Sequence, residues 1–149
     1  MTVKSSADAC FAIMGHNDSS GAVVDAAIKV HTALGPGLLE GAYEGCLVHE
    51  LRKRGHLVVH QLGLPIVYDE VCIDLGYRID LLVDGVVVVE VKSVGKLAPI
   101  HNAQLLSYLK LGGYKLGLLI NFNVPQLKDG IRRIVNDFPD SLRSPRPQR

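Results

Sequence analysis

The residues best suited to chemistry are Asp80, Glu90 and Lys92, in the segment RIDLLVDGVVVVEVKSVGK at residues 78–96. The rest of this segment is dominated by Val, Ile and Leu, which is typical of strands at the centre of a sheet. Burying a charge without a partner is energetically costly or forces the group to change its protonation state. The segment therefore predicts either a site that uses its charges or an edge strand whose polar face meets water.

The turn of this hairpin decides whether the two carboxylates can meet. Side chains alternate along VVVVEVK, so Glu90 and Lys92 point to the same face. A strict two-residue turn would pair Asp80 with Val89 and place the carboxylates on opposite faces. A three-residue loop or a bulge, which Gly85 favours, pairs Asp80 with Glu90 instead. We therefore predict a hairpin that departs from the two-residue form.

Two carboxylates that converge on one point repel each other unless a cation lies between them. Hard oxygen ligands of this kind suit Mg²⁺ or Mn²⁺. A nearby lysine can hold a water molecule or stabilise developing negative charge, because its ammonium acts as a point charge. Metal, water and lysine together are the components of phosphodiester hydrolysis. The residue types alone thus indicate a hydrolytic site.

The composition is that of one ordinary globular domain, with 149 residues of which 48% are hydrophobic and 21% charged. No segment has the roughly 20 apolar residues of a membrane span, and the N-terminus lacks the pattern of a secretory signal. We therefore predict an intracellular, cytoplasmic protein that does not enter a membrane. Cys10, Cys46 and Cys72 have no paired spacing, so we expect buried free thiols rather than disulfides or a zinc site.

The charge is unevenly distributed along the chain. Up to Val91 there are 6 Lys/Arg and 12 Asp/Glu, a net of −6, and from Lys92 onward there are 10 and 3, a net of +7. The basic half could contact a polyanion. Alternatively, the two halves pack against each other or are simply solvated.

The predicted elements surround this hairpin. Helical spacing covers 20–37, where a Ser could cap the start, and 38–55, where Leu39, Tyr43, Leu47 and Leu51 form one stripe. Residues 57–68, 71–76, 77–83 and 86–92 indicate successive strands. A helix at 98–113 and strands at 115–122 and 130–136 follow. We divide the chain into an N-terminal segment (1–20), one folded domain (21–137) and a tail (138–149) predicted to be disordered.

The segment DLLVDGVVVVEVK resembles the D-x(n)-(D/E)-x-K signature of the PD-(D/E)XK nuclease superfamily. The remaining motifs resemble one branch, the GxxExxY protein family, whose naming motif is present as GLLEGAY at Gly37 to Tyr43. LGYRIDLLV, EVK, AQLLSYLKL and GLLINF also match, so that the resemblance covers roughly residues 22–136. Ile79 stands where the superfamily usually has proline before the aspartate.

The resemblance implies an α/β fold with a restriction-endonuclease-like core, in which a central mixed β-sheet is flanked by α-helices. It also implies that Asp80 and Glu90 bind Mg²⁺ or Mn²⁺ and that the carbonyl of Val91 adds a ligand. By the same resemblance Lys92 positions the nucleophilic water.

The other site residues implied by the resemblance have alternative interpretations. Glu40 resembles the acidic residue that the first core helix supplies as a metal ligand, although Glu44 one turn later competes for that role. Gln104 and Tyr108 match a QxxxY element that lines the site, Gln104 near the chemistry and Tyr108 near the substrate. They could equally be a surface amide and a core aromatic. Lys96 either contacts a phosphate or is solvated.

The first functional hypothesis is therefore a metal-dependent nuclease acting on DNA or RNA. The second is a binding module on the same fold, without catalysis, that holds nucleic acid or a protein. The third is a metal-dependent hydrolase of nucleotides. The resemblance also leads us to expect a homodimer, because members of the superfamily often pair subunits to reach both strands of a duplex.

Overall fold

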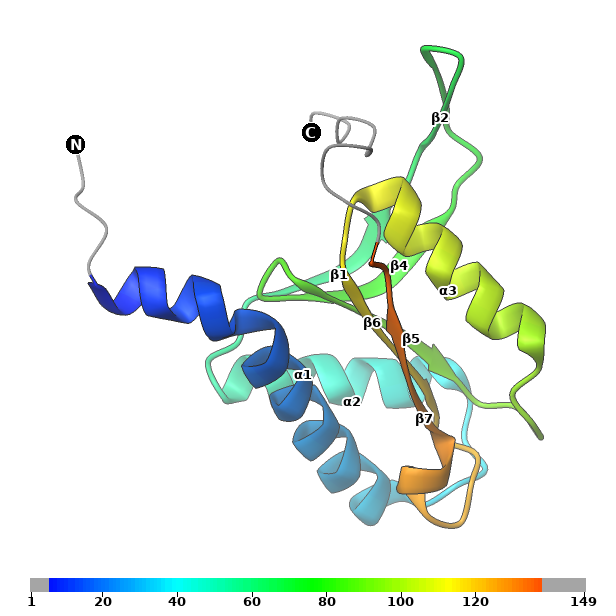
Figure 1. Cartoon of the computed structure of the whole chain (residues 1–149). Helices are drawn as coiled ribbons and strands as arrows, with labels where there is room; N and C mark the ends of the chain where they lie inside the picture. Colours follow the sequence, from blue (N-terminus) through cyan, green and yellow to red (C-terminus); the bar gives the residue numbers. More distant parts are fainter. Residues whose placement is uncertain (1–5, 138–149) are drawn as a thin grey trace.

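The protein was analysed as a computed structural model, which describes the backbone of residues 6–137 and the side chains of residues 18–137. This part of the chain contains three α-helices, seven strands and one short 3₁₀ helix (Figure 1). Their bounds are α1 Ser6–Leu34, α2 Glu40–Lys53, β1 Val58–Gly63, β2 Ile66–Tyr68, β3 Val71–Ile73, β4 Arg78–Val83, β5 Val87–Lys92, α3 Pro99–Gly112, β6 Leu116–Asn121, η1 Leu127–Gly130 and β7 Ile131–Val135.

The core is a five-stranded mixed sheet in the order β1-β4-β5-β6-β7. Strands β5 and β6 are parallel, from Val87 opposite Leu116 to Lys92 opposite Asn121, and α3 forms the crossover between them. All the other neighbours in this sheet are antiparallel. Every residue of β6 and all but the last of β5 are buried. This explains their nearly continuous apolar sequences, because helices cover both faces of these strands.

The helices form one layer on each face of the sheet. Apolar side chains of α1 and α2 pack with Leu81, Val89 and Leu118 in one core cluster. Those of α3 pack with Leu82, Val88 and Leu119 in a second cluster on the opposite face. The predicted α/β fold with a mixed sheet between helices is confirmed.

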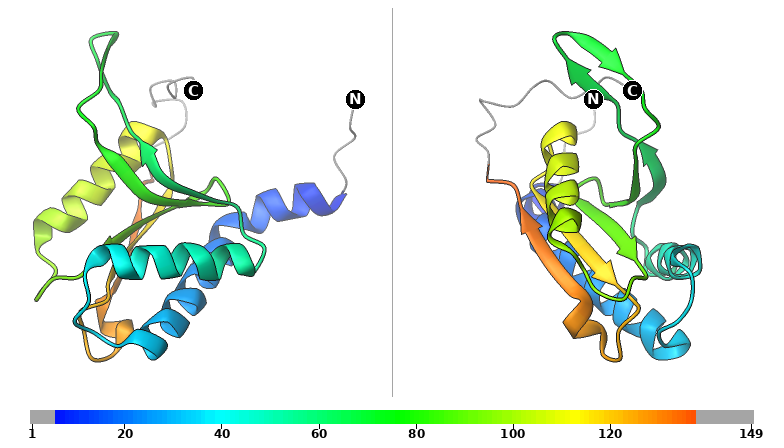
Figure 2. Two further views of the ribbon diagram at one scale, coloured as in Figure 1. Left: turned by 180° about the vertical axis from the view of Figure 1, so that it is seen from behind. Right: turned by 90° about the vertical axis from the view of Figure 1, so that its right-hand side faces the viewer.

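The β2–β3 hairpin projects from this body as a separate two-stranded sheet (Figure 2). Its side chains are mostly exposed, including Tyr68 at 70% and Val71 at 58% relative exposure. The single strand expected over 57–68 is thus divided into β1 and β2, and the strand expected over 71–76 is shortened to β3. Strands β2 and β3 pair with each other and do not join the central sheet. Strand periodicity does not reveal which sheet a strand enters, because that depends on distant partners.

Several local expectations are corrected by the structure. Helix α1 begins at Ser6 and not near Ser20, so no serine caps it at the predicted position. The stripe on α2 loses its first member, because Leu39 is the exposed N-cap residue while the other three are buried. Cys46 and Cys72 are exposed rather than buried. The predicted disordered tail lies outside the described residues, as does the side chain of Cys10.

Within the described part of the chain, no helix is long and apolar enough to cross a membrane.

The β4–β5 turn has the predicted three-residue form. Val83 pairs with Val87, which leaves residues 84–86 as the loop, and Val86 N donates to Val83 O at 3.1 Å. Asp84 and Gly85 both have positive φ, 54° and 71°. Asp is one of the few residues besides Gly that adopts this conformation readily.

The carboxylate of Asp84 connects the turn to two other parts of the chain. Its Oδ2 accepts from Ser19 Oγ of α1 at 2.7 Å and lies 2.8 Å from His56 Nδ1, and its Oδ1 accepts from Leu57 N at 3.0 Å. Burial disfavours the charged form, but these hydrogen bonds outweigh it and hold the pKa of Asp84 below its ordinary value. Ser19 thus has a tertiary role and does not cap a helix.

Asp84→Ala is expected to lower the free energy of unfolding by about 2–4 kcal/mol, because Ser19, His56 and Leu57 N all lose their acceptor. Because the folded pKa of Asp84 is depressed, this contribution is present near neutral pH and is lost as pH falls through that pKa. Urea unfolding at pH 7 measures the loss, with Asp84→Asn as the isosteric control that should lose less. Equal stability of wild type and Asp84→Ala would contradict the assignment.

Candidate active site

Asp80 and Glu90 meet where strands β4 and β5 begin to separate. The ladder ends at Leu81 opposite Val89, and one further step of the same register sets Asp80 opposite Glu90. Beyond that point side chains replace backbone partners: Val91 N donates to Asp80 Oδ2 at 2.9 Å, and Asp80 N donates to Glu90 Oε1 at 3.3 Å. The three-residue turn therefore brings the two carboxylates together, as the sequence predicted.

Glu90 is buried, with 5% relative exposure, although it is an acid. Its burial and then the negative charge of Asp80 raise its pKa to about 8, while the neighbouring Lys92 acts in the opposite direction. In the protein without metal, Glu90 therefore holds a proton at neutral pH. At neutral pH the pair ionises fully when positive charge arrives between the two carboxylates.

Lys92 is half-buried at the end of β5, two residues beyond Glu90 on the same strand. Its backbone carbonyl accepts from Phe122 N at 2.9 Å, so the residue that follows β6 holds the end of β5 in place. The next loop is also held, because Asn121 Oδ1 accepts from Val94 N and Asn121 Nδ2 donates to Val94 O. Asn121 is not among the predicted site residues, although a buried Asn at the end of an apolar strand is a usable signal.

In the GLLEGAY motif, Tyr43 lies one turn into α2 and its hydroxyl contacts the backbone of the turn that precedes this helix. Its hydroxyl donates to Gly35 O and accepts from Leu38 N at 3.1 Å, and its ring stacks on Phe122 with centroids 4.6 Å apart. These contacts fix the turn that precedes α2. Glu40, the first residue of α2, is consequently held next to the end of β5.

The two candidate acids of α2 reach different sides of the site. Glu40 Oε1 accepts from Ser93 N at 3.4 Å, directly after Lys92. Glu44 Oε1 lies 2.8 Å from His60 Nε2 and accepts from the amide of Gln61, which also donates to Asp80 Oδ1 at 3.4 Å. Glu44 is therefore connected to Asp80 through the side chain of Gln61, whereas Glu40 contacts the backbone just after β5.

Tyr108 approaches the Asp80–Glu90 pair from α3, and Gln104 contacts Tyr108. Gln104 Nε2 donates to Tyr108 Oη at 3.1 Å, and the ring of Tyr108 lies 6.1 Å from that of Tyr77. Burial and then the charge of Glu90 raise the pKa of Tyr108. Tyr108 is thus both a core aromatic and a neighbour of Glu90, while the side chain of Gln104 lies on the exposed side of the helix.

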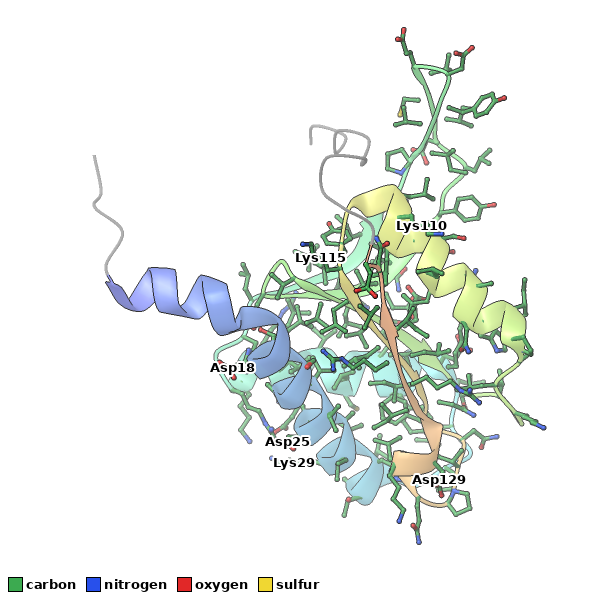
Figure 3. All side chains as sticks on the ribbon, viewed as in Figure 1. Asp18, Asp25, Lys29, Lys110, Lys115 and Asp129 are labelled. Atoms are coloured by element: carbon green, nitrogen blue, oxygen red, sulfur yellow. The ribbon has the colours of Figure 1, made fainter. Side chains whose placement is uncertain are left out.

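Among the described residues of the C-terminal half, the lysines are distributed over both ends of the central sheet. Lys110 and Lys115 lie at the end of the sheet that carries the β4–β5 turn, opposite to the end where Asp129 lies (Figure 3). Lys92 and the exposed Lys96 follow the carboxyl ends of the central strands. Lys96 therefore follows β5 at the same end of the sheet as Lys92. That it contacts a substrate phosphate remains a prediction.

The donor set fits a magnesium-type ion. In the described residues no three His, Cys, Asp or Glu side chains converge closely enough to hold a metal by themselves. Two carboxylates do converge, and a cation bound between them would lower the raised pKa of Glu90. Mg²⁺ is often held by one or two carboxylates while its other positions keep water or substrate phosphate, so an incomplete protein shell suits it.

Comparison with known proteins agrees with this geometry. A search of the curated proteins gives no significant match, and a search of the solved structures gives none either. A family model described as the PD-(D/E)XK nuclease superfamily matches residues 17–134. This range contains the central sheet except for the last residue of β7, both candidate acids of α2 and the Asp80–Glu90 hairpin. The chain therefore belongs to the PD-(D/E)XK nuclease superfamily.

Proposed function

We propose that the protein is a Mg²⁺- or Mn²⁺-dependent nuclease that hydrolyses phosphodiester bonds of DNA or RNA, within the GxxExxY branch of its superfamily. Superfamily membership supports nuclease activity, and nucleases of this superfamily generally use divalent metals. The observation that carries the proposal is the convergence of Asp80 and Glu90 with Lys92 two residues further along the strand.

In this proposal Asp80, Glu90 and the carbonyl of Val91 hold the ion, and Glu40 adds a ligand or a water-mediated contact from α2. Bound there, a divalent cation supplies Lewis-acid polarisation of the phosphate and lowers the pKa of a bound water. Occupancy requires that Glu90 give up the proton that it otherwise holds at neutral pH.

The ammonium of Lys92 acts from beside the carboxylate pair. It donates hydrogen bonds that orient the attacking water, and its charge opposes the negative charge that develops on the phosphate oxygens. Gln104 and Tyr108 supply polar groups on the α3 side for the substrate backbone, and Lys96 supplies a phosphate contact beyond β5. A cytoplasmic location and a homodimer remain predictions.

Cleavage of end-labelled single- and double-stranded DNA and RNA with Mn²⁺ tests the proposal. Wild type should cleave at least one substrate, and EDTA should stop the reaction. Lys92→Ala, purified identically, controls for a contaminating nuclease. Mn²⁺-dependent retention of oligonucleotides without cleavage would identify a binding module instead, and hydrolysis of nucleotides alone would identify a nucleotide hydrolase. Either outcome overturns the nuclease proposal.

A further inference from the structure

Gln61 has an unusual backbone conformation in the middle of strand β1. Its φ is 56°, in the left-handed region that non-glycine residues adopt only at an energetic cost. The β1–β4 ladder pairs His60 with Leu81 and Leu62 with Ile79, and it omits the step between them. By register, the residue opposite Gln61 at that omitted step is Asp80.

This conformation changes where the Gln61 side chain points. In a regular strand, consecutive side chains lie on opposite faces. Here His60 Nε2 lies 2.8 Å from Glu44 Oε1, and Gln61 Nε2 donates to the same oxygen. Two consecutive residues can reach one carboxylate only because the backbone rotates at Gln61.

The Gln61 amide also contacts the candidate metal ligand. Nε2 donates to Asp80 Oδ1 at 3.4 Å, while Asp80 Oδ2 accepts from Val91 N at 2.9 Å. Both oxygens of Asp80 are therefore oriented before any ion arrives. A primary amide has two N–H groups and no charge, so it can connect two carboxylates without competing with a cation as lysine or arginine would.

We infer that Gln61 is a positioning residue, which holds Asp80 in its ligand orientation and connects it to Glu44 of α2. The inference rests on the proposed function for its metal component. Gln61 is exposed, so burial of its side chain does not explain why the strand keeps an unfavourable conformation there. Backbone strain that folding does not require is characteristic of functional sites.

The experiment compares Gln61→Gly with Gln61→Ala, since both remove the amide and only glycine tolerates positive φ without strain. Arg132→Gly and Arg132→Ala, at an exposed position of strand β7, form the matched control pair. In EDTA, the Gly variant at position 61 should have the higher Tm, by about 1–4 °C. At position 132 the order should be reversed, because glycine weakens an ordinary strand.

Calorimetric titration with Mn²⁺ provides the second readout. Both Gln61 variants should show a Kd raised about 10- to 100-fold, with a comparable fall in kcat, because outer-shell partners orient metal ligands. Both Arg132 variants should match wild type. A lower Tm for Gln61→Gly than for Gln61→Ala, or an unchanged Mn²⁺ Kd in both, would overturn the inference.

Failure of the proposed function can be distinguished from failure of the role assigned to Gln61. If wild type bound no Mn²⁺, the metal assignment would fall, and a double-mutant cycle in EDTA would decide the role of Gln61. Coupling between Glu44→Gln and Asp80→Asn in the free energy of unfolding is expected in the Gln61 background and should disappear with Gln61→Ala. Coupling that is equal in the two backgrounds would reject the connection through Gln61.

Discussion

Lys92→Ala is expected to lower kcat for phosphodiester cleavage about 10²- to 10⁴-fold, the range for loss of a group that positions water or stabilises developing charge. The Kd for Mn²⁺ should change little. The physical reason is that the proposed metal ligands Asp80 and Glu90 contact each other directly, whereas Lys92 acts on Glu90 only through its charge and is not a proposed ligand. Single-turnover cleavage measures the rate, and calorimetry measures metal binding.

Lys96→Ala provides the control for loss of a positive charge near the strand end. Lys96 is exposed, so its removal should weaken substrate binding modestly and reduce the salt dependence of KM without a large change in kcat. If Lys92→Ala and Lys96→Ala gave the same small effect, Lys92 would be one phosphate contact among several. A large rise in the Mn²⁺ Kd with unchanged kcat at saturating metal would also contradict its assigned role.

The hairpin was the most predictable part of the site, because its geometry is set locally. Gly85 permits a loop with positive φ, and the period of two along β5 fixes which side chains share a face. The central strands were predictable for a similar reason, since helices on both faces demand apolar residues throughout. The α3 contribution followed from helical spacing, which puts Gln104 and Tyr108 one turn apart.

Features that depend on distant contacts were not predictable. A serine was expected to cap a helix at residue 20, but α1 already runs from Ser6, and the hydroxyl of the neighbouring Ser19 donates to Asp84, 65 residues away. The β2–β3 hairpin has the same strand pattern as the core, and no local signal shows that it leaves the central sheet. The left-handed conformation of Gln61 could not be predicted from the sequence either, since glutamine, unlike glycine, does not favour positive φ.

The choice between Glu40 and Glu44 shows the same limit. Both lie on α2, one turn apart, and the motif spacing favours Glu40. The structure places Glu40 beside Ser93 and connects Glu44 through Gln61 to Asp80. Helical spacing predicts that the two acids share a face, but their partners lie on distant segments, at Ser93 after β5 for Glu40 and in strand β1 for Glu44.

Without metal, the protein should lose stability as pH rises from about 5 to 8, because of Glu90. The folded pKa of Glu90 is about 8 and its ordinary value is 4.5. Between these values the folded state keeps a proton that the unfolded state has released, so the free energy of unfolding falls as pH rises. The slope is at most about 1.4 kcal/mol per pH unit for one proton. Below 4.5 both states are protonated, and the effect is absent.

Urea unfolding in EDTA at pH 5, 6, 7 and 8 measures this slope, and Glu90→Gln is the matched control. The variant is neutral and nearly isosteric, so its profile should lack the contribution from Glu90 and be flatter over the same range. Asp84 and Glu50 have lowered pKa values, and their contributions therefore fall at more acidic pH. Parallel profiles for wild type and Glu90→Gln would show that Glu90 ionises normally.

Metal should abolish the same slope, because a cation takes over the role of the proton on Glu90. Binding of Mn²⁺ at pH 7 should release about one proton, measurable by calorimetry in two buffers with different ionisation enthalpies. At pH 9, where Glu90 is already ionised in the free protein, the release should be much smaller. Glu90→Gln should release none at either pH. Proton release that did not depend on pH would show that the ion binds elsewhere, since only a group titrating near pH 8 links binding to protons in this way.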